Sequence, residues 1–308
     1  MCVQTGALED HDTAAEAGEV RALIDGLGIP GIIDVHTHFM PDSVLRKVWH
    51  YFDRVGERAA PWPITYRHQE DVRLAALRGF GVQTFSSLVY PHKPEMAAWL
   101  NGWAAEFADR TLDCLRTATF YPEPSAAQYV PAALADGAQI FKSHIQVGAY
   151  DPRDPLLEPV WSALEAAGTP VIIHAGSGPE PGPYTGIAPI AEVLDRHPEL
   201  VAVIAHLGMP EYREFLDLAE RHPNVHLDTT MAFTGYVEAM HPFPVTERTR
   251  LRALGERIVF GSDFPNIPYR YLDAVRSIID LDLGDDWAAG VLYGNGARLF
   301  GPPRGARA

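Results

Sequence analysis

The segment Ile32-Ile33-Asp34-Val35-His36-Thr37-His38 decides the fold. It is an apolar run, typical of a buried strand, that ends in two histidines separated by one residue. Three later apolar runs also end in a residue able to bind a metal: His174, His206 and Asp263. Residues two apart on a strand point to the same face, so we expect His36 and His38 to converge. Ligands from the ends of several parallel strands meet at one point only if the strands close into a barrel.

Apolar runs of strand length alternate with longer amphipathic segments, which is typical of repeated strand–helix units. The expected strands cover residues 31–37, 82–88, 114–120, 138–144, 170–174, 200–206, 224–229 and 257–262. The expected helices that follow them cover 69–79, 93–109, 125–136, 156–167, 186–196, 211–221, 246–254 and 269–280. Eight such units in about 250 residues are the usual size of an α/β (β/α)₈ barrel, the TIM barrel.

We expect this barrel to form one domain over residues 31–301. A leader with one helix, over 15–27, accounts for residues 1–30, and a C-terminal tail covers 302–308. An insertion over 39–68 follows the first strand and is rich in aromatic residues. The sequence leaves three roles open for the aromatic side chains of this insertion: a lid over the site, packing of the insertion back onto the barrel, or a buried subunit contact.

Composition narrows the class of protein. The chain has 308 residues, 47% of them hydrophobic, which suffices for a substantial core. A net charge of −15 without a basic run argues against nucleic acid or an anionic membrane as a partner. No run of about 18 apolar residues suggests a membrane span, the N-terminus lacks a secretory pattern, and two cysteines make no disulfide framework. We therefore expect a soluble cytoplasmic protein, with a homo-oligomer as an open alternative.

Metal-binding residue types gather at the expected C-terminal ends of strands, the face where barrel active sites lie. These residues are His36, His38, Lys142, His144, His174, His206, Asp228 and Asp263. Imidazole and carboxylate are ligands that Zn²⁺ and similar ions accept, and an open metal position lowers the pKa of bound water to about 7. A single histidine after a strand is more often structural. Four histidines and an aspartate at matched positions favour a metal centre.

The chain resembles the amidohydrolase superfamily, and its amidohydrolase-2 branch in particular, which includes aminocarboxymuconate-semialdehyde decarboxylase. The matching residues are His36, His38, Lys142, His174, His206 and Asp263. Four phrases match as well: Asp34-Val35-His36-Thr37-His38-Phe39, His206-Leu207-Gly208, Gly261-Ser262-Asp263-Phe264-Pro265 and the run from Gly294 to Phe300. It implies a (β/α)₈ barrel in which His36, His38, His174 and Asp263 bind one divalent metal, Zn²⁺ being favoured. It makes His206 the general base or acid.

A binuclear centre is the alternative to a single metal. In binuclear members of the superfamily a carbamylated lysine bridges two metals and a strand-6 histidine binds the second. Lys142 and His206 stand at those positions in this chain. Candidate substrate contacts are His144, Tyr90, His92, Arg153 and Asn266, and His144 fits a supporting role behind a ligand equally well. Asp34 is expected to share the face of His36, one layer deeper, with a structural role.

Three functions stay open. The resemblance implies first a metal-dependent hydrolase, in which activated water attacks an amide, lactone or ester-like bond and Asp263 or His206 handles the proton. The second is a nonoxidative decarboxylase of an aromatic or enol-type acid, with His206 as proton donor. The third, a non-catalytic metal-binding barrel, is disfavoured because no ligand position is occupied by an apolar residue.

Overall fold

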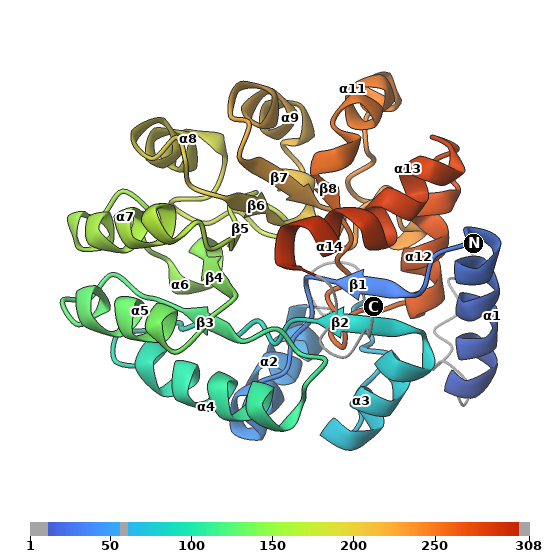
Figure 1. Ribbon diagram of the computed structural model, residues 1–308, viewed down its shortest axis with the longest axis horizontal. Coiled ribbons are helices and arrows are strands. Elements are labelled where there is room, and N and C mark those ends of the chain that lie inside the picture. The colour runs from blue at the N-terminus through green and yellow to red at the C-terminus, as the bar shows by residue number, and fades with distance from the viewer. Residues whose placement is uncertain (1–11, 56–60, 302–308) are drawn as a thin grey trace.

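The computed structural model describes residues 12–55 and 61–301, and it confirms the (β/α)₈ barrel (Figure 1). The strands of this part of the chain are all parallel to their neighbours. They are β1 (Ile32–Asp34), β2 (Val82–Phe85), β3 (Thr117–Thr119), β4 (Ile140–His144), β5 (Val171–His174), β6 (Ala202–Ile204), β7 (Val225–Asp228) and β8 (Ile258–Val259).

Two bridges close the ring of strands. β1 pairs with β2, and β3 to β8 form a second run in sequence order. Thr37 bridges to Phe264, which joins β1 to the end of β8, and Phe85 bridges to Cys114, which joins β2 to β3. The strands are shorter than predicted: β4 and β5 start later but end as expected, whereas others also end early. The largest loss is at β8, where Ile258–Val259 replaces the expected 257–262 because its last residues already bend into a loop.

Helices surround the strands in the predicted places, with ends that differ by a few residues (Figure 1). The main ones are α3 (Glu70–Gly79), α4 (Ala97–Arg110), α5 (Ala126–Ala135), α7 (Glu158–Ala167), α8 (Ile187–Arg196), α9 (Tyr212–Arg221), α11 (Arg248–Ala253) and α12 (Tyr271–Ile279). Figure 1 shows them as a ring outside the barrel. Short helices interrupt two loops where none was predicted, α6 (Ile145–Gly148) and α10 (Gly235–Glu238).

The C-terminal segment was also missed by the sequence analysis. It forms α13 (Asp285–Ala289), a π-helical turn (Gly290–Gly294) and α14 (Asn295–Phe300). Tyr293, Ala297, Leu299 and Phe300 of this segment pack against a core cluster made of strand residues. Figure 1 shows α14 lying across the middle of the ring of strands. The segment therefore plugs one end of the barrel.

Two core clusters separate the inside of the barrel from its outside. Ile33, Ile140, Ile172, Val203 and Val259 come from five strands and form one buried cluster that fills the interior. Their immediate neighbours on the strands, such as Phe141, Val171 and Ile204, belong to the larger cluster under the surrounding helices. This alternation identifies which strand positions point inward.

The leader and the insertion each contain a helix. α1 (Thr13–Gly26) begins after Asp12, whose side chain accepts hydrogen bonds from two backbone amides of the first turn, and it packs against α3 and α12. α2 (Asp42–Val55) belongs to the insertion after β1. Residues 1–11, 56–60 and 302–308 of the predicted leader, insertion and tail lie outside the described residues. None of the described helices is long and apolar enough to cross a membrane.

Candidate metal centre

Four of the candidate residues occupy inward positions at the ends of regular strands. Lys142 and His144 follow Ile140 at two-residue intervals on β4, and His174 follows Ile172 on β5. Asp228 ends β7. His144 pairs with His174 in the register of β4 and β5, and their rings stack with centroids 4.2 Å apart. Strand alternation alone therefore explains why these side chains face one another.

His36, His38 and Asp263 meet although they lie beyond the regular strands. One Oδ1 atom of Asp263 lies 2.8 Å from Nε2 of His38 and 3.5 Å from Nε2 of His36. The potential ligand atoms of the three residues all lie within 4.8 Å of one another, and all three residues are buried. Asp263 has a φ of 70°, a left-handed conformation that turns its side chain back toward β1. The structure thus gathers three of the four predicted ligands.

Gly261 makes room for this convergence. A Cβ atom added at Gly261 would lie 2.2 Å from Oγ1 of Thr230 and 2.6 Å from Cβ of His36. Both distances are far shorter than a van der Waals contact. The strand that leads to Asp263 can approach His36 this closely only because residue 261 has no side chain.

The predicted place of Asp34 is wrong. Asp34 accepts hydrogen bonds from Oγ of Ser262 at 2.6 Å and from the Tyr271 hydroxyl, on α12, at 2.9 Å. It also accepts from the backbone amides of His36 and Ser262. Because α12 lies outside the barrel, Asp34 faces outward and does not share the inward face of His36. Ile33 and Val35 on either side of Asp34 belong to the interior cluster, so alternation turns Asp34 outward, and the expected layer below His36 does not exist. The structural role expected for Asp34 agrees with these four bonds, two of which tie β1 to Ser262 in the turn before Asp263.

His206 reaches the same cluster through a bend in the backbone. The inward positions on β6 are Val203 and Ala205, so strict alternation would turn His206 outward. His206 and Leu207 instead have φ values of 57° and 53°, both left-handed. The His206 ring then lies 5.2 Å from the His36 ring and 4.8 Å from the His174 ring, centroid to centroid. Left-handed backbone is unfavourable for residues with side chains, and such strain is commonly found at functional sites.

Each histidine of the cluster has one ring nitrogen held by the protein. Nδ1 of His36 donates to the Asp228 carboxylate at 2.8 Å, and Nδ1 of His38 donates to the Leu88 carbonyl at 2.8 Å. Nδ1 of His206 donates to the Thr230 carbonyl at 3.1 Å, and Nε2 of His174 donates to the Gly178 carbonyl at 2.9 Å. These bonds leave Nε2 of His36 and His206, and Nδ1 of His174, as nitrogens able to bind a cation. Nε2 of His38 lies 2.8 Å from Oδ1 of Asp263, and a cation held by both residues would replace that contact.

The protonation states also suit a cation. Burial, together with the charge of Lys142, lowers the pKa of His36 to about 3, so this ring is neutral at pH 7. Burial lowers the pKa of His174 well below its usual range as well. For Asp263, burial would raise the pKa, but the hydrogen bond with His38 and the electrostatic interactions with His38, His36 and His206 outweigh it, and the pKa falls. Neutral imidazoles and an ionised carboxylate are the donor set that a divalent cation such as Zn²⁺ accepts, so the residues fit the metal.

His174 is adjacent to the three gathered ligands without joining them in this structure. Its Nε2 is held by Gly178, and it is absent from the set of ligand atoms that lie within 4.8 Å of one another. Its ring nevertheless stands between His144 and His206 in the same group of rings. The place of His174 in the coordination sphere therefore stays a prediction.

Lys142 lies at the centre of the cluster. Its Nζ atom is 3.1 Å from Nε2 of His36, and its side chain is fully buried. Burial lowers the pKa of Lys142 to about 8, although the charges of Asp228 and Asp263 work in the opposite direction. A cation at Nε2 of His36 would repel an ammonium at this distance, so metal binding requires a neutral, modified or displaced Lys142. Its position agrees with both the mononuclear and the binuclear alternative.

The predicted substrate contacts fall into two groups. Tyr90 and His144 border the cluster: the Tyr90 ring packs edge-on against His38 at 5.5 Å and lies 4.8 Å from His144. Arg153 lies on the surface instead, where it pairs with Asp151 at 2.8 Å and with Glu192 at 2.9 Å. His92 is exposed, although it follows Tyr90 by only two residues.

Asn266 anchors the insertion over the turn that carries Asp263. Its Oδ1 atom accepts a hydrogen bond from Nε1 of Trp49 at 3.0 Å, and its carbonyl accepts from Nε1 of Trp62 at 2.7 Å. The Trp62 ring also stacks on Phe52. These aromatic residues therefore pack the insertion back onto the barrel, which is one of the alternatives left open by the sequence.

The sequence analysis missed several partners that hold the site. The carbonyl groups of Leu88, Gly178 and Thr230 and the side chains of Ser262 and Tyr271 fix the orientation of the candidate ligands or of their strands. No residue pattern reveals a carbonyl that meets a histidine from another strand. Only Ser262 could have been found from the sequence, because it stands between Gly261 and Asp263 in one of the phrases that carry the resemblance.

Comparison with known proteins gives the class to which this site belongs. The family model described as amidohydrolase matches residues 33–301. The chain therefore belongs to the amidohydrolase family, whose members are metal-dependent enzymes that act on small molecules. A comparison of the sequence with curated proteins found no match.

Solved structures show the same barrel in distant relatives. An uncharacterised TIM-barrel protein from Bordetella bronchiseptica is 20% identical, with a TM-score of 0.67 over 87% of this chain and 98% of that one. A 5-carboxyvanillate decarboxylase from Novosphingobium aromaticivorans, solved with bound manganese, is 14% identical, with a TM-score of 0.59 over 89% and 98%. A probable 2-pyrone-4,6-dicarboxylic acid hydrolase from Acinetobacter baumannii is 15% identical, with a TM-score of 0.60 over 88% and 100%. At these identities the likeness concerns the fold.

Proposed function

We propose that this chain is a metal-dependent hydrolase that cleaves an amide, lactone or ester-like bond of a small molecule. One observation carries the proposal: His36, His38 and Asp263 converge with their potential ligand atoms within 4.8 Å, at the catalytic face of an amidohydrolase barrel. One divalent cation, with Zn²⁺ favoured, would be held by His36, His38, Asp263 and His174. A cation bound there supplies Lewis acidity, which polarises a carbonyl and acidifies water.

His206 is the proposed proton carrier. Its Nδ1 donates to the Thr230 carbonyl, which leaves the Nε2 lone pair free. Burial lowers the pKa of His206, although the charges of Asp263 and Asp228 oppose the shift, so the ring starts neutral. A neutral imidazole can take a proton from attacking water and return it to the leaving group. Asp263, which adjoins His38 and His36, is the second candidate for this role.

The cations near the site favour hydrolysis over decarboxylation. A decarboxylase must hold a substrate carboxylate, and Arg153 and Arg270 are two arginines in the loops that follow β4 and β8. Arg153 is paired with Asp151 and Glu192. Arg270 is paired with Glu19 and Asp273. Neither guanidinium is therefore available without breaking an ion pair, whereas hydrolysis of a neutral carbonyl compound needs no such grip.

Decarboxylation of an aromatic or enol-type acid is the second candidate. The specific observation in its favour is Lys142, a buried amine 3.1 Å from Nε2 of His36 that could hold a substrate carboxylate inside the cluster. The decarboxylase among the structural neighbours shows that the fold accommodates this chemistry.

Isotope labelling of the products separates the two reactions. Zn²⁺- and Mn²⁺-loaded protein would be incubated in H₂¹⁸O with a panel of aryl esters, lactones and anilides, and in D₂O with a panel of hydroxybenzoic acids. We expect one ¹⁸O atom in the carboxylate product of an ester, lactone or anilide. Release of CO₂ with deuterium on the ring carbon, and no ¹⁸O uptake, would identify a decarboxylase.

The double variant His36→Ala/His38→Ala is the control for both reactions. It should fold, as judged by circular dichroism, but contain little metal by elemental analysis and turn over no substrate. A full metal content in this variant would contradict the proposed ligands.

A further inference from the structure

The first turn of α12 is held by residues from two distant parts of the chain. The backbone amide of Tyr271 donates to the Tyr66 hydroxyl at 2.7 Å, and the amide of Leu272 donates to Oε1 of Glu16 at 2.8 Å. The Tyr66 hydroxyl in turn donates to the Glu16 carboxylate, whose oxygens lie 2.8 and 2.7 Å away. The first amides of a helix have no partner within the helix, and its dipole favours a carboxylate there. The leader helix α1 and the insertion therefore cap α12 together.

Glu16 is buried for this contact. Its side chain is 1% exposed, and a carboxylate is rarely buried unless it is paired or hydrogen-bonded. Glu19, one turn further along α1, also joins α1 to α12 but does so on the surface. It lies 3.5 Å from the guanidinium of Arg270 and 3.4 Å from that of Arg276. The buried contact through Glu16 and the exposed contact through Glu19 can thus be removed separately.

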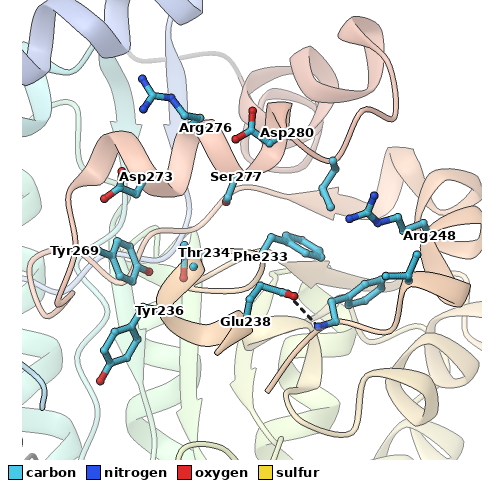
Figure 2. A pocket seen from close by; sticks show the side chains of 14 residues that line it. Phe233, Thr234, Tyr236, Glu238, Arg248, Tyr269, Asp273, Arg276, Ser277 and Asp280 are labelled. Atoms are coloured by element: carbon cyan, nitrogen blue, oxygen red, sulfur yellow. Dashed lines mark hydrogen bonds between the residues drawn. The ribbon is translucent and has the colours of Figure 1, made fainter. Parts of the chain in front are cut away.

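One side of α12 borders open space. Asp273, Arg276 and Ser277 line a cavity of about 470 Å³ between α12 and the segment after β7 (Figure 2). Side chains beside a cavity make fewer packing contacts than those in a filled core. The position of the first turn of α12 therefore depends on the hydrogen bonds from Tyr66 and Glu16.

Tyr271 links that first turn to the barrel. Its hydroxyl donates to Oδ2 of Asp34, on β1, at 2.9 Å, and both side chains are fully buried. The Tyr271 ring stacks on Phe80, with centroids 4.8 Å apart and planes 11° apart. Because the ring is confined in this way, a shift of the first turn of α12 moves the hydroxyl relative to Asp34.

Asp34 holds the backbone on both sides of the candidate ligand Asp263. It accepts hydrogen bonds from the amide of Ser262 at 3.1 Å and from the Ser262 hydroxyl at 2.6 Å. The same hydroxyl accepts from the amide of Phe264 at 3.0 Å. Asp263, between them, has a φ of 70°, and a left-handed residue with a side chain persists only where its surroundings hold it. Asp34 supplies part of that hold.

We propose that α1 is a positioning element for the metal centre, in which Glu16 and Tyr271 act through Asp34 to keep Asp263 in its left-handed conformation. Glu16 acts on the first turn of α12, and Tyr271 passes its position on to Asp34. Both are positioning residues, because neither contacts a candidate ligand directly. The inference rests on the function proposed above, since it requires a cation held by Asp263.

Co²⁺-loaded protein tests the inference, because the visible spectrum of protein-bound Co²⁺ reports the arrangement of its ligands. Tyr271→Phe removes the hydroxyl and keeps the ring, and Glu16→Gln keeps the shape and removes the charge, so both should fold. We expect each to change the spectrum and to weaken Co²⁺ binding about three- to tenfold in competition with a chromophoric chelator. This is less than the 10- to 100-fold typical of a residue that holds a ligand directly.

Two control variants remove similar interactions elsewhere. Tyr212→Phe removes the hydrogen bond that a buried tyrosine hydroxyl donates to the His241 carbonyl. Glu19→Gln removes the exposed ion pairs between α1 and α12. Both controls should keep the wild-type Co²⁺ affinity and spectrum even where urea unfolding shows a loss of stability, so a merely structural role is distinguished from positioning.

The double variant Glu16→Gln/Tyr271→Phe tests whether the two residues act in series. Its loss of affinity should not exceed that of Tyr271→Phe, because Glu16 acts through Tyr271. Losses that multiply, or wild-type affinity and spectrum in Tyr271→Phe or Glu16→Gln, would overturn the inference, and either single variant decides if the other does not fold. These results leave the metal centre standing, whereas a wild-type protein that binds no Co²⁺ would refute the centre and this inference with it.

Discussion

The Asp228 carboxylate holds His36 by a hydrogen bond of 2.8 Å to Nδ1, across 192 residues of sequence. Its other oxygen accepts from the backbone amides of His206 at 2.8 Å and Thr230 at 3.0 Å. One buried carboxylate at the end of β7 therefore orients a candidate metal ligand and also fixes the bend that brings His206 inward. Carboxylates that hold a ligating histidine in this way set its tautomer and raise its basicity.

Asp228→Asn should weaken metal binding about 10- to 100-fold while the barrel stays folded, because the amide retains the shape but loses the charge behind His36. Competition with a chromophoric chelator measures the affinity. Asp217→Asn is the matched control, since Asp217 pairs with Arg250 on the surface. If both variants bind metal as tightly as the wild type, Asp228 does not support His36 in the metal-bound protein.

His206→Asn should keep the fold and most of the metal but lose turnover by about 10²–10⁴-fold, the usual contribution of a positioned proton carrier. Steady-state kinetics and elemental analysis of the same preparation provide the two measurements. Loss of a second metal equivalent would show that His206 is a ligand and that the centre is binuclear. Full activity with full metal content would show that it is neither carrier nor ligand.

Gly261→Ala should destabilise the protein by about 1–3 kcal/mol and reduce its metal content, because the new Cβ would overlap Thr230 and His36. Urea unfolding gives the free-energy change. Gly235→Ala is a suitable control, since a Cβ there meets nothing within 4 Å. Equal stability of the two variants would mean that β8 can move away from His36 at little cost.

His226→Gln should make the protein less sensitive to acid. Burial, followed by the charges of Arg257 and Arg298, lowers the pKa of His226 from 6.5 to about 4. Between these values the unfolded chain binds a proton that the folded chain does not, so wild-type stability falls as the pH falls from 6.5 toward 4. At pH 7 His226 is largely neutral in both the folded and the unfolded chain, so its protonation takes little stability away there.

Urea unfolding at pH 7 and pH 5 measures that loss. The loss should be smaller in His226→Gln than in the wild type, by at most about 1.4 kcal/mol per pH unit. The exposed His50 provides the control, and His50→Gln should behave as the wild type. An identical loss in His226→Gln would contradict the predicted shift.

The sequence by itself determined the barrel and the inward direction of four candidate site residues. Eight apolar runs and their helices are set by local hydrophobic patterning, which is visible without any long-range contact. The inward positions of Lys142, His144, His174 and Asp228 follow from the same patterning, because each continues the two-residue alternation of a regular strand.

Tertiary structure decided how the remaining site residues turn. His206 and Asp263 lie beyond the regular strands and adopt left-handed backbone. Strand alternation therefore does not predict the directions of their side chains. The sequence analysis placed Asp34 beneath His36, whereas it faces outward, toward Ser262 and Tyr271. The site is held by hydrogen bonds between residues far apart in the sequence, such as the bond between Asp228 and His36, which are 192 positions apart. A local sequence pattern carries no information about such partners, because only the closed barrel brings them together.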